Sequence, residues 1–429
     1  MRVLVVGGGG REHAIVRALA RAAAGIELLC APGNAGVAAD ARCLEVGADD
    51  VRGIVDAAVA ENVDFVVVGP EAPLVAGVVD ALEASGVAAF GPSAEAARIE
   101  GSKIHAKELM TAAGVPTASH TVLRSLEEAR DHLACASYPA VLKADGLAAG
   151  KGVIIAASEA EAREATDVFF VEERFGATEV VLEEHLEGEE LSLLALCDGE
   201  NVVPLAPAQD YKRIFNGDRG PNTGGMGSYS PVPGFDRKRT DEIVAAVHRP
   251  VVDLMRRRGT PYAGVLYAGL MITEAGPKVL EFNCRFGDPE TQAVLPRLHS
   301  SLLDLCRAAR EPGGLAGAVA EFDERWAVTV VLASAGYPES SSKGDVIDGL
   351  EEAARVPDVE VLHAGTARRD GDVVTAGGRV LNVTALGASP GEARDRAYEA
   401  ANMISFEGMQ LRTDIADRAV SPVRDAAGT

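Results

Sequence analysis

The chain has 429 residues and a formal net charge of −23, with 47% hydrophobic and only 4% aromatic residues. This length suits about three domains, and the acidity argues against binding to nucleic acid or to an anionic membrane surface, which both need basic side chains. No apolar run reaches the roughly 18 residues of a membrane helix, and the sequence shows no signal peptide. We therefore expect a cytoplasmic protein without nucleic-acid or membrane partners.

Strands and helices alternate over about the first hundred residues. Short runs rich in Val and Leu predict strands, and the segments between them have the apolar spacing of helices. The expected strands cover 2–6, 27–30, 64–68 and 88–90, and the expected helices cover 11–24, 51–60 and 74–85. This alternation predicts an α/β fold with a doubly wound parallel sheet.

The elements follow a different order after residue 102. We expect helices at 103–113, 158–168, 239–258 and most of 295–309, and strands at 140–144, 152–156, 179–183, 191–196, 265–272 and 277–282. The stretch 205–227 is polar and glycine-rich, which predicts a long loop that is functional or mobile, with a disordered linker as the alternative. After residue 314, strands at 326–334, 360–364, 373–375 and 379–386 and a helix at 390–404 predict a small α+β domain, with a frayed tail from about Val420.

The first glycine loop, Gly7–Gly10, follows a strand and opens a helix, where an anion can bind. A dinucleotide fingerprint needs a third glycine where this chain has Glu12, and it needs an acid at the end of the second strand, which is absent. Nicotinamide binding is therefore disfavoured. A phosphate-bearing small molecule over Gly9, Gly10 and Arg11 remains open, as does a tight turn without a ligand.

A second glycine loop runs from Lys143 to Gly152. It differs from a Walker A loop because one residue is missing from the spacing and no Ser or Thr follows Lys151. A glycine-rich hairpin between two strands can cover a polyphosphate with its backbone N–H groups, while Lys143 and Lys151 supply positive charge. The alternative is a plain flexible turn.

Glu281 and Asn283 lie two residues apart on an expected strand, so their side chains share a face. A carboxylate and an amide oxygen suit a hard cation such as Mg²⁺ that also binds ATP phosphates. The charged turn that follows, which includes Arg285 and Asp288, is more typical of a site than of plain surface.

Together these stretches resemble the ATP-grasp superfamily and, within it, the family of phosphoribosylamine–glycine ligases (glycinamide ribonucleotide synthetases). The resemblance covers essentially the whole chain. It rests on GGREHA (9–14), APGNAG (31–36), VGPEAPLV (68–75), FGPS (90–93), EGSK (100–103), KADGLAAGKGV (143–153), GPNTGGMG (220–227), LYAGLM (266–271), EFNCRFGDPETQ (281–292) and TAGGRVLNVTALG (375–387). The stretch 281–292 is specific to this family and not to ATP-grasp enzymes at large.

The resemblance implies an N-terminal Rossmann-like domain (1–101), a two-lobed ATP-grasp core (102–314) with a lid lobe at about 118–190, and a C-terminal cap (315–429). It implies that Glu281 and Asn283 bind Mg²⁺ or Mn²⁺. It places ATP on Lys103, Lys143, Gly146, Gly150, Lys151, Gly152, Glu183, Glu184, Leu186 and Glu190. The substrate side would comprise Gly9, Gly10, Arg11, Glu12, Glu71, Asn222, Thr223, Gly224, Gly225, Arg285 and Asp288, and the catalytic residues would be Arg285, Lys143, Asp210 and Lys212.

The family's reaction joins glycine to 5-phosphoribosylamine through an acyl phosphate, with ATP as co-substrate. We expect a monomer that transiently contacts the enzyme supplying the unstable amine. Two departures stand out: Gly8 replaces a frequent Asn, and the strand around Tyr267–Met271 lacks the extra acidic metal ligand of many ATP-grasp enzymes. The alternatives are another ATP-grasp ligase or carboxylase, and a non-catalytic nucleotide-binding module.

Overall fold

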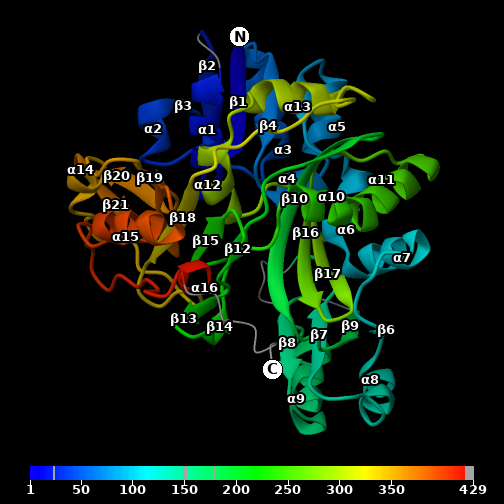
Figure 1. The fold of residues 1–429 in the computed structure, drawn as a ribbon. Helices are drawn as coiled ribbons and strands as arrows, with labels where there is room; N and C mark the ends of the chain where they lie inside the picture. Colours follow the sequence, from blue (N-terminus) through cyan, green and yellow to red (C-terminus); the bar gives the residue numbers. More distant parts are fainter. Residues whose placement is uncertain (23–24, 148–151, 177–178, 421–429) are drawn as a thin grey trace.

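The N-terminal part of the chain folds around a five-stranded parallel sheet in the order β3-β2-β1-β4-β5 (Figure 1). The computed structural model describes residues 1–22, 25–147, 152–176 and 179–420. The strands are β1 Arg2–Gly7, β2 Glu27–Pro32, β3 Arg42–Cys43, β4 Phe65–Val68 and β5 Ala88–Phe90. The prediction of a doubly wound sheet is confirmed. Its strand order reverses between β1 and β4, and the loops after these two strands meet there.

Helices pack against this sheet. They are α1 Gly10–Ala22, α2 Val37–Asp40, α3 Val51–Ala60, α4 Glu71–Val75 and α5 Val78–Ala84. The single helix predicted at 74–85 is wrong, because Gly77 adopts a left-handed conformation (φ 85°) that ends α4 and lets α5 start in a new direction.

The centre of the molecule is an antiparallel sheet in the order β11-β10-β16-β17. Its strands are β10 Glu189–Asp198, β11 Val202–Pro204, β16 Ala263–Thr273 and β17 Gly276–Asn283, and the neighbouring helices include α6 Ala94–Gly101, α7 Lys103–Ala113, α12 Glu290–Val294 and α13 Leu302–Arg310. The long helix predicted at 239–258 is two helices, α10 Arg237–Ala246 and α11 His248–Arg257. Pro250 explains the break, because it has no N–H to continue the helical ladder to Ala246.

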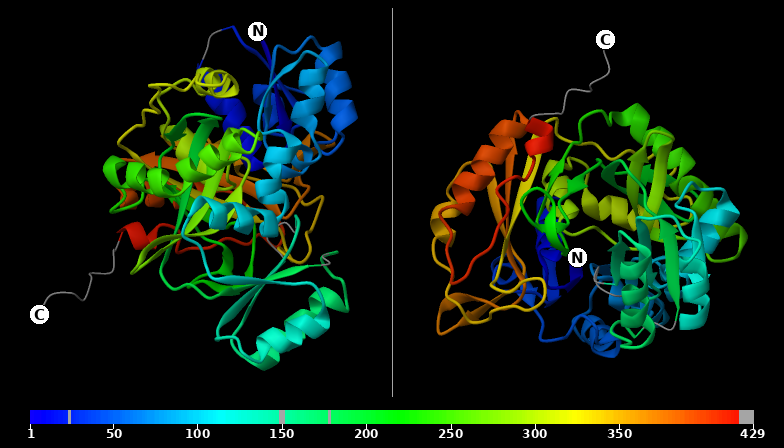
Figure 2. Two further views of the ribbon diagram at one scale, coloured as in Figure 1. Left: turned by 90° about the vertical axis from the view of Figure 1, so that its right-hand side faces the viewer. Right: turned by 90° about the horizontal axis from the view of Figure 1, so that it is seen from below.

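A separate lobe carries the sheet β6-β9-β7-β8, made of β6 His120–Leu123, β7 Ala140–Ala144, β8 Val153–Ala156 and β9 Val180–Glu184. Its helices are α8 Leu126–Leu133 and α9 Glu159–Phe170, and it stands away from the rest of the molecule (Figure 2). This lobe has a hydrophobic core of its own, in which Leu142 and Phe169 are fully buried.

The C-terminal sheet, in the order β12-β15-β18-β22-β19, includes two strands that come from the middle of the chain. Its strands are β12 Gln209–Asp210, β15 Gly227–Ser230, β18 Trp326–Ala333, β19 Val359–His363 and β22 Arg379–Gly387. The prediction of a structureless loop at 205–227 is therefore wrong: β12 pairs with β15, β15 pairs with β18, and β13 Arg213–Phe215 forms a hairpin with β14 Arg219–Asn222. β12 and β15 can be short and polar because β18, about a hundred residues later, completes their sheet.

The remaining C-terminal elements flank this sheet. They are α14 Leu350–Ala353, the hairpin of β20 Thr366–Arg369 and β21 Asp372–Thr375, α15 Pro390–Ala401 and α16 Asp417–Val420. The expected α+β architecture is thus present. Most of the tail predicted to be frayed, residues 421–429, lies outside the described residues.

Candidate active site

One face of the central sheet gathers polar side chains from three strands. Tyr267 on β16 lies opposite Asn283 on β17, and Gly269 lies opposite both Glu281 on β17 and Ser192 on β10. Residues directly opposite one another in an antiparallel pair share a face. The structure thus confirms that Glu281 and Asn283 point the same way and adds two hydroxyl groups to their surroundings.

The Glu281 carboxylate lies among cations. Burial alone would raise the pKa of Glu281, but four positively charged side chains outweigh burial and lower this pKa. They are, in order of effect, Lys212, Lys143, Lys103 and Arg285. In a chain of net charge −23, this concentration of positive charge around one ionised carboxylate suits a bound polyphosphate.

Two lysines share the buried carboxylate of Glu183. Its Oε2 lies 3.0 Å from Lys143 Nζ and 3.1 Å from Lys107 Nζ, while its Oε1 is buried without a hydrogen-bond partner among the described residues. Lys143 Nζ also donates to the Leu280 carbonyl (3.0 Å). Burial lowers the pKa of Lys107 to about 8 although Glu183 opposes this shift. Glu183 therefore fixes two ammonium groups and keeps one carboxylate oxygen available for a donor.

Lys103 lies at the start of α7 and donates to the carbonyl of Gly146 in the second glycine loop (2.8 Å). Asp145 of the same loop accepts the Ile104 N–H at 3.1 Å and so ties the loop to this helix end. Gly152 closes the hairpin by accepting the Ala144 N–H at 2.8 Å. Gly150 and Lys151 lie outside the described residues.

The segment between the two lobes holds the residues expected near adenine and ribose. Glu184 ends β9, where its Oε1 accepts the Ser119 N–H (2.9 Å) and pairs with Lys278 (3.0 Å). Leu186 is buried. Glu190 on β10 binds the ammonium of Lys212. These residues lie where the chain passes from β9 of the lid lobe to β10 of the central sheet.

Asp210 lies on β12, where it is buried beside other acids. Burial raises the pKa of Asp210 to about 7, helped by the nearby carboxylates of Glu290, Glu190 and Glu281. Lys212 opposes this shift only in part, because its Nζ is 4.0 Å from Asp210 Oδ1 and is bound to Glu190. Asp210 can therefore exchange a proton near neutral pH.

The first glycine loop contains its own anion. The Glu12 carboxylate accepts the Gly9 N–H at 2.6 Å and pairs with Arg11 at 2.5 Å. Arg11 also donates to the Phe286 carbonyl (3.2 Å), which brings the N-terminal sheet to the turn after β17. The structure thus brings Gly9, Gly10, Arg11 and Glu12 close to the turn after β17. The Glu12 carboxylate occupies the Gly9 N–H, which is a donor of this loop.

Arg285 joins the two sheets. Its Nε lies 3.1 Å from Glu71 Oε2 after β4, and its Nη2 lies 3.2 Å from Glu100 Oε1 on α6. Burial would raise the pKa of Glu71, but Arg285 and Arg11 outweigh it and lower this pKa to about 2. Glu71 is therefore ionised throughout the neutral range.

The turn 222–225 closes one side of the site. Its Thr223 Oγ1 donates to the Lys212 carbonyl (2.8 Å) and accepts the Gly225 N–H (2.9 Å). Asp288 lies next to it and pairs with Arg379 of β22 (3.1 Å). The structure thus brings together the predicted residues of this region, from Asp210 to Asp288, and adds a C-terminal side chain to them.

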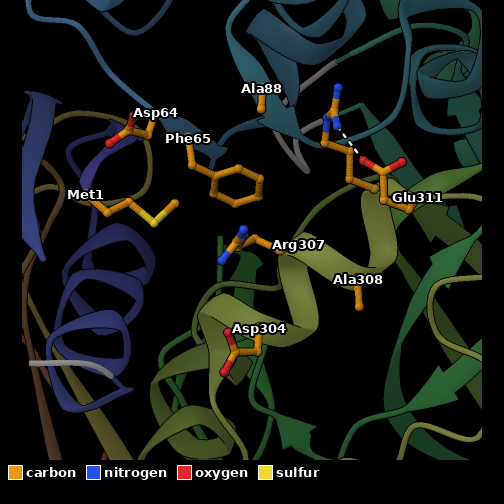
Figure 3. Close-up of a pocket in the computed structure, with 9 residues that line it drawn as sticks. Met1, Asp64, Phe65, Ala88, Asp304, Arg307, Ala308 and Glu311 are labelled. Carbon is orange, nitrogen blue, oxygen red and sulfur yellow. Dashed lines mark hydrogen bonds and ion pairs between the residues drawn. The ribbon is translucent and has the colours of Figure 1, made fainter.

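A cavity of about 590 Å³ lies at the opposite edge of the N-terminal sheet (Figure 3). Met1, Phe65 and Ala88 line it at the amino ends of β1, β4 and β5, together with residues of α13 such as Arg307. Ligands of doubly wound sheets bind at the carboxyl ends of the strands. None of the predicted site residues lines this cavity, so it is separate from the site.

The sequence matches three domains of one family. These are the N domain of phosphoribosylglycinamide synthetase over residues 1–100, its ATP-grasp (A) domain over 101–291 and its C domain over 327–418. The phosphoribosylamine–glycine ligase of Streptomyces coelicolor is 52% identical over 427 residues, which are 98% of this chain and 99% of that protein. The chain belongs to the phosphoribosylglycinamide synthetase family.

A solved member of the phosphoribosylglycinamide synthetase family has the same fold. The crystal structure of phosphoribosylamine–glycine ligase from Thermotoga maritima has a TM-score of 0.82 and 36% identity, covering 96% of this chain and all of that one. Biotin carboxylase of Campylobacter jejuni, at 15% identity, has a TM-score of 0.73 over 98% of this chain and 95% of its own, which shows a shared fold. The protein is an ATP-dependent ligase of purine biosynthesis that acts on small molecules and uses a divalent metal.

The oxygens of Glu281 and Asn283, which were predicted to hold a metal, fit a cation that also binds ATP phosphates. Across residues 1–22, 25–147, 152–176 and 179–420, no three His, Cys, Asp or Glu side chains converge on one point. Two protein oxygens, from Glu281 and Asn283, suit a cation whose other ligands are phosphate and water. Within the same residues, no helix is long and apolar enough to cross a membrane.

Sequence reasoning missed several side chains of the synthetase site. Lys107 was visible only as one of eight lysines, and its partner Glu183 is 76 positions away. Glu100 and Glu290 lie within stretches that carry the family resemblance, yet nothing in their spacing marks them as buried. Arg379 and Tyr337 belong to the C-terminal part, which was expected to be a cap.

Proposed function

We propose that the protein joins glycine to 5-phosphoribosylamine, giving glycinamide ribonucleotide, ADP and phosphate in de novo purine biosynthesis. The observation that carries this proposal is the ionised Glu281 carboxylate, which shares a sheet face with Asn283 and is surrounded by four cations. Such a site neutralises a polyphosphate and the charge that develops as a phosphoryl group is transferred. Cytoplasmic location and a monomeric state remain expectations, and light scattering would measure the latter.

We assign ATP to the region in which side chains of the lid lobe and of the central sheet meet, where Lys143 donates to the Leu280 carbonyl. Lys103 and Lys143 would contact its phosphates, and Glu281 and Asn283 would hold Mg²⁺, or Mn²⁺ in its place. The buried Oε1 of Glu183, which has no hydrogen-bond partner within the described part of the chain, suits the amino group of adenine, and Leu186 offers an apolar contact for the ring. Glu184 and Glu190 would lie beside adenine and ribose. When bound, the metal supplies positive charge to the phosphate oxygens.

We assign glycine to the side of the site formed by Asp210, Lys212 and the turn 222–225. A glycine carboxylate oxygen attacks the γ-phosphorus of ATP, and ADP leaves, so that the carboxylate becomes an acyl phosphate. The amine of phosphoribosylamine then attacks the acyl carbon and phosphate leaves. Asp210, with its pKa of about 7, is suited to accept the proton that the amine loses.

We assign phosphoribosylamine to the crevice between the loops after β1 and β4. Gly9, Gly10, Arg11, Glu12 and Glu71 would surround it. Arg285 lies between this crevice and the cations around Glu281, so it is placed to meet the substrate phosphate or the transferred phosphoryl group. Its planar fork of donors suits phosphate oxygens.

We propose that residues 118–190 act as a lid and that borders near 101 and 314 separate three domains, with β12 and β15 joining the sheet of the third domain across the second border. The separate core of the lid lobe supports rigid-body movement, because no apolar cluster has to break. Closure of the second glycine loop, with Gly146 and Gly152, would protect the acyl phosphate from water.

An ADP-release assay with ATP, Mg²⁺, glycine and freshly generated phosphoribosylamine tests the proposal when each component is omitted in turn. We expect ADP formation to need both glycine and the amine. Glu281→Ala should lower the rate at least 100-fold, whereas the exposed Glu274→Ala on the β16–β17 turn should leave it unchanged. ADP release that is independent of glycine would instead indicate another ATP-grasp ligase.

A further inference from the structure

Two side chains of the C-terminal part bind the backbone of Gly224 from both directions. Arg379 Nη1 on β22 donates to the Gly224 carbonyl at 2.6 Å, and the Tyr337 hydroxyl accepts the Gly224 N–H at 2.9 Å. Both polar groups of this peptide segment are therefore satisfied by residues more than 100 positions away. Gly224 belongs to the turn that we assign to the glycine side of the site.

The same guanidinium holds Asp288. Arg379 Nη1 donates to the Asp288 carbonyl at 3.0 Å, and Nη2 pairs with its Oδ2 at 3.1 Å. The other oxygen, Oδ1, accepts a hydrogen bond from Gln292 Nε2 at 2.6 Å. Burial would lower the pKa of Arg379, but Asp288 outweighs it and raises this pKa. The Arg379 guanidinium, which clamps Gly224 to Asp288, therefore stays charged in the neutral pH range.

Close packing leaves no room for side chains on two residues of the turn. A Cβ atom on Gly224 would lie 2.9 Å from Arg379 Cζ, and a Cβ on Gly225 would lie 2.3 Å from Pro289 Cδ. Gly225 also has a φ of +111°, which residues other than glycine rarely adopt. The turn thus lies between the guanidinium on one side and the segment after Asp288 on the other, while Gly224 itself remains exposed.

Two side-chain amides connect the Arg379–Asp288 pair to the first glycine loop. Gln292, which binds Asp288, and Asn382 of β22 both reach the start of α1, where a Cβ on Gly10 would lie 2.9 Å and 2.1 Å from their nitrogen atoms. Strand β22 therefore contacts the two segments that we assign to different substrates.

We infer that Arg379 is a positioning residue, which fixes the Gly224–Gly225 turn against Asp288 and so shapes the site for both glycine and phosphoribosylamine. This inference rests on the proposed function. Arg379 acts through backbone groups and Asp288, with which it makes two hydrogen bonds and one ion pair. It is not among the cations that lower the pKa of Glu281, so its loss should affect ATP less than the other substrates. The C-terminal part of the chain then forms one side of the substrate site through Arg379 and Tyr337.

Steady-state kinetics of Arg379→Met and Arg379→Lys test this inference, with Arg369→Met on the exposed β20–β21 hairpin as the control. We expect Arg379→Met to raise the KM for glycine or for phosphoribosylamine at least about 10-fold and to leave the KM for ATP within about 2-fold. Arg379→Lys should show a smaller increase in KM than Arg379→Met but should not restore the wild-type value, because one ammonium group cannot reproduce the two-pronged contacts of the guanidinium with Gly224 and Asp288. A purely structural role would change thermal stability or kcat without this split between the KM values.

Tyr337→Phe serves as a milder second variant, which keeps the ring and removes only the acceptor of the Gly224 N–H. It should raise the same KM values about 3-fold, and unchanged substrate KM values in both variants would overturn the inference. Wild-type protein that forms no glycine-dependent ADP would overturn the proposed function, and the inference with it. Wild-type activity together with a changed KM for ATP alone would overturn the inference and leave the proposed function intact.

Discussion

The carboxylate of Glu12 accepts the backbone N–H of Gly9 at 2.6 Å, so the glycine loop binds an anion that belongs to the protein. The side chain of Glu12 also fills the space beside Gly7 of this loop and beside Gly69 after β4, since a Cβ on Gly7 or Gly69 would lie 2.5 or 2.1 Å from its atoms. Position 12 is where a dinucleotide fingerprint has its third glycine. In this chain the Glu12 carboxylate therefore occupies the position at which the pyrophosphate of a dinucleotide would approach the loop.

Glu12→Gln should destabilise the protein by about 2–4 kcal/mol. The substitution keeps the shape but leaves the guanidinium of Arg11, which is 8% exposed, without its carboxylate. Urea unfolding measures this loss. Glu27→Gln is the control, because the pair of Glu27 with Arg2 is about half exposed and should contribute less than about 1 kcal/mol. If both substitutions lowered the free energy of unfolding equally, burial of the Arg11–Glu12 pair would not be what makes it stabilising.

The sequence predicted those parts of the site in which local spacing determines geometry. Glu281 and Asn283 share a face because strand period is 2, and the glycine loop follows β1 because apolar runs mark buried strands. Lys107 could not be paired with Glu183 in this way, because their contact depends on how α7 packs against the lid lobe. Tertiary packing, and not sequence spacing, sets such contacts.

The secondary-structure predictions also failed where tertiary contacts decide the structure. The strands β12 and β15 were missed because they are short and polar and belong to a sheet whose next strand, β18, comes about a hundred residues later. The break after Ala246 was also missed, although Pro250, which cannot donate within a helix, marks it in the sequence. A local rule could therefore have found the helix break, whereas the sheet to which β12 and β15 belong depends on tertiary pairing.

Gly269→Ala should weaken activity by crowding Glu281, which we propose as a metal ligand. Gly269 lies opposite Glu281, and a Cβ there would be 3.3 Å from Glu281 Cγ and 3.5 Å from Tyr267 Cε1. Glu281 must shift by a few tenths of an ångström, so we expect the Mg²⁺ concentration for half-maximal activity to rise about 10-fold. The measurement is a Mg²⁺ titration of ADP release at fixed ATP. Gly276→Ala is no control, because of its φ of +110°, whereas Ala275→Ser on the same exposed turn is suitable.

An unchanged Mg²⁺ requirement in Gly269→Ala would show that Glu281 adapts without cost. Packing against Glu281 would then not be the reason for a glycine at this position.

Stability should fall as the pH drops below about 6.5 because of His248. This imidazole is fully buried, with Nε2 donating to the Leu193 carbonyl (3.2 Å), and burial lowers its pKa to about 4. Since the unfolded chain binds the proton more readily, stability is complete above pH 6.5 and is lost as the pH falls through 4. The loss should reach about 3 kcal/mol.

Urea unfolding between pH 4 and 8 checks this prediction. His248→Gln should flatten the acidic side of the profile, although its absolute stability will be lower. His132→Gln, at an exposed position on α8, should leave the profile unchanged. An acidic slope that survives in His248→Gln would assign the effect to other groups, of which His363, with a pKa that burial lowers to about 3, is the next to test.

Lys107→Met should raise the KM for ATP about 10-fold. Lys107 and Lys143 share Oε2 of Glu183 at 3.1 and 3.0 Å, so removal of Lys107 leaves Lys143 as the sole cation on a buried carboxylate. Lys143 is then bound more strongly by Glu183 and neutralises ATP phosphates less well. Because the glycine side lies on other strands, the KM for glycine should stay within about 2-fold.

Two further variants separate this effect from general loss of structure. Thr117→Val removes the hydroxyl that accepts from Lys107 Nζ at 2.7 Å and should raise the KM for ATP in the same direction by a smaller factor. Lys238→Met, whose side chain is 85% exposed on α10, should have no effect. Equal increases in the KM values for ATP and glycine would mean that Lys107 supports the whole site, and the shared carboxylate would then not act on ATP alone.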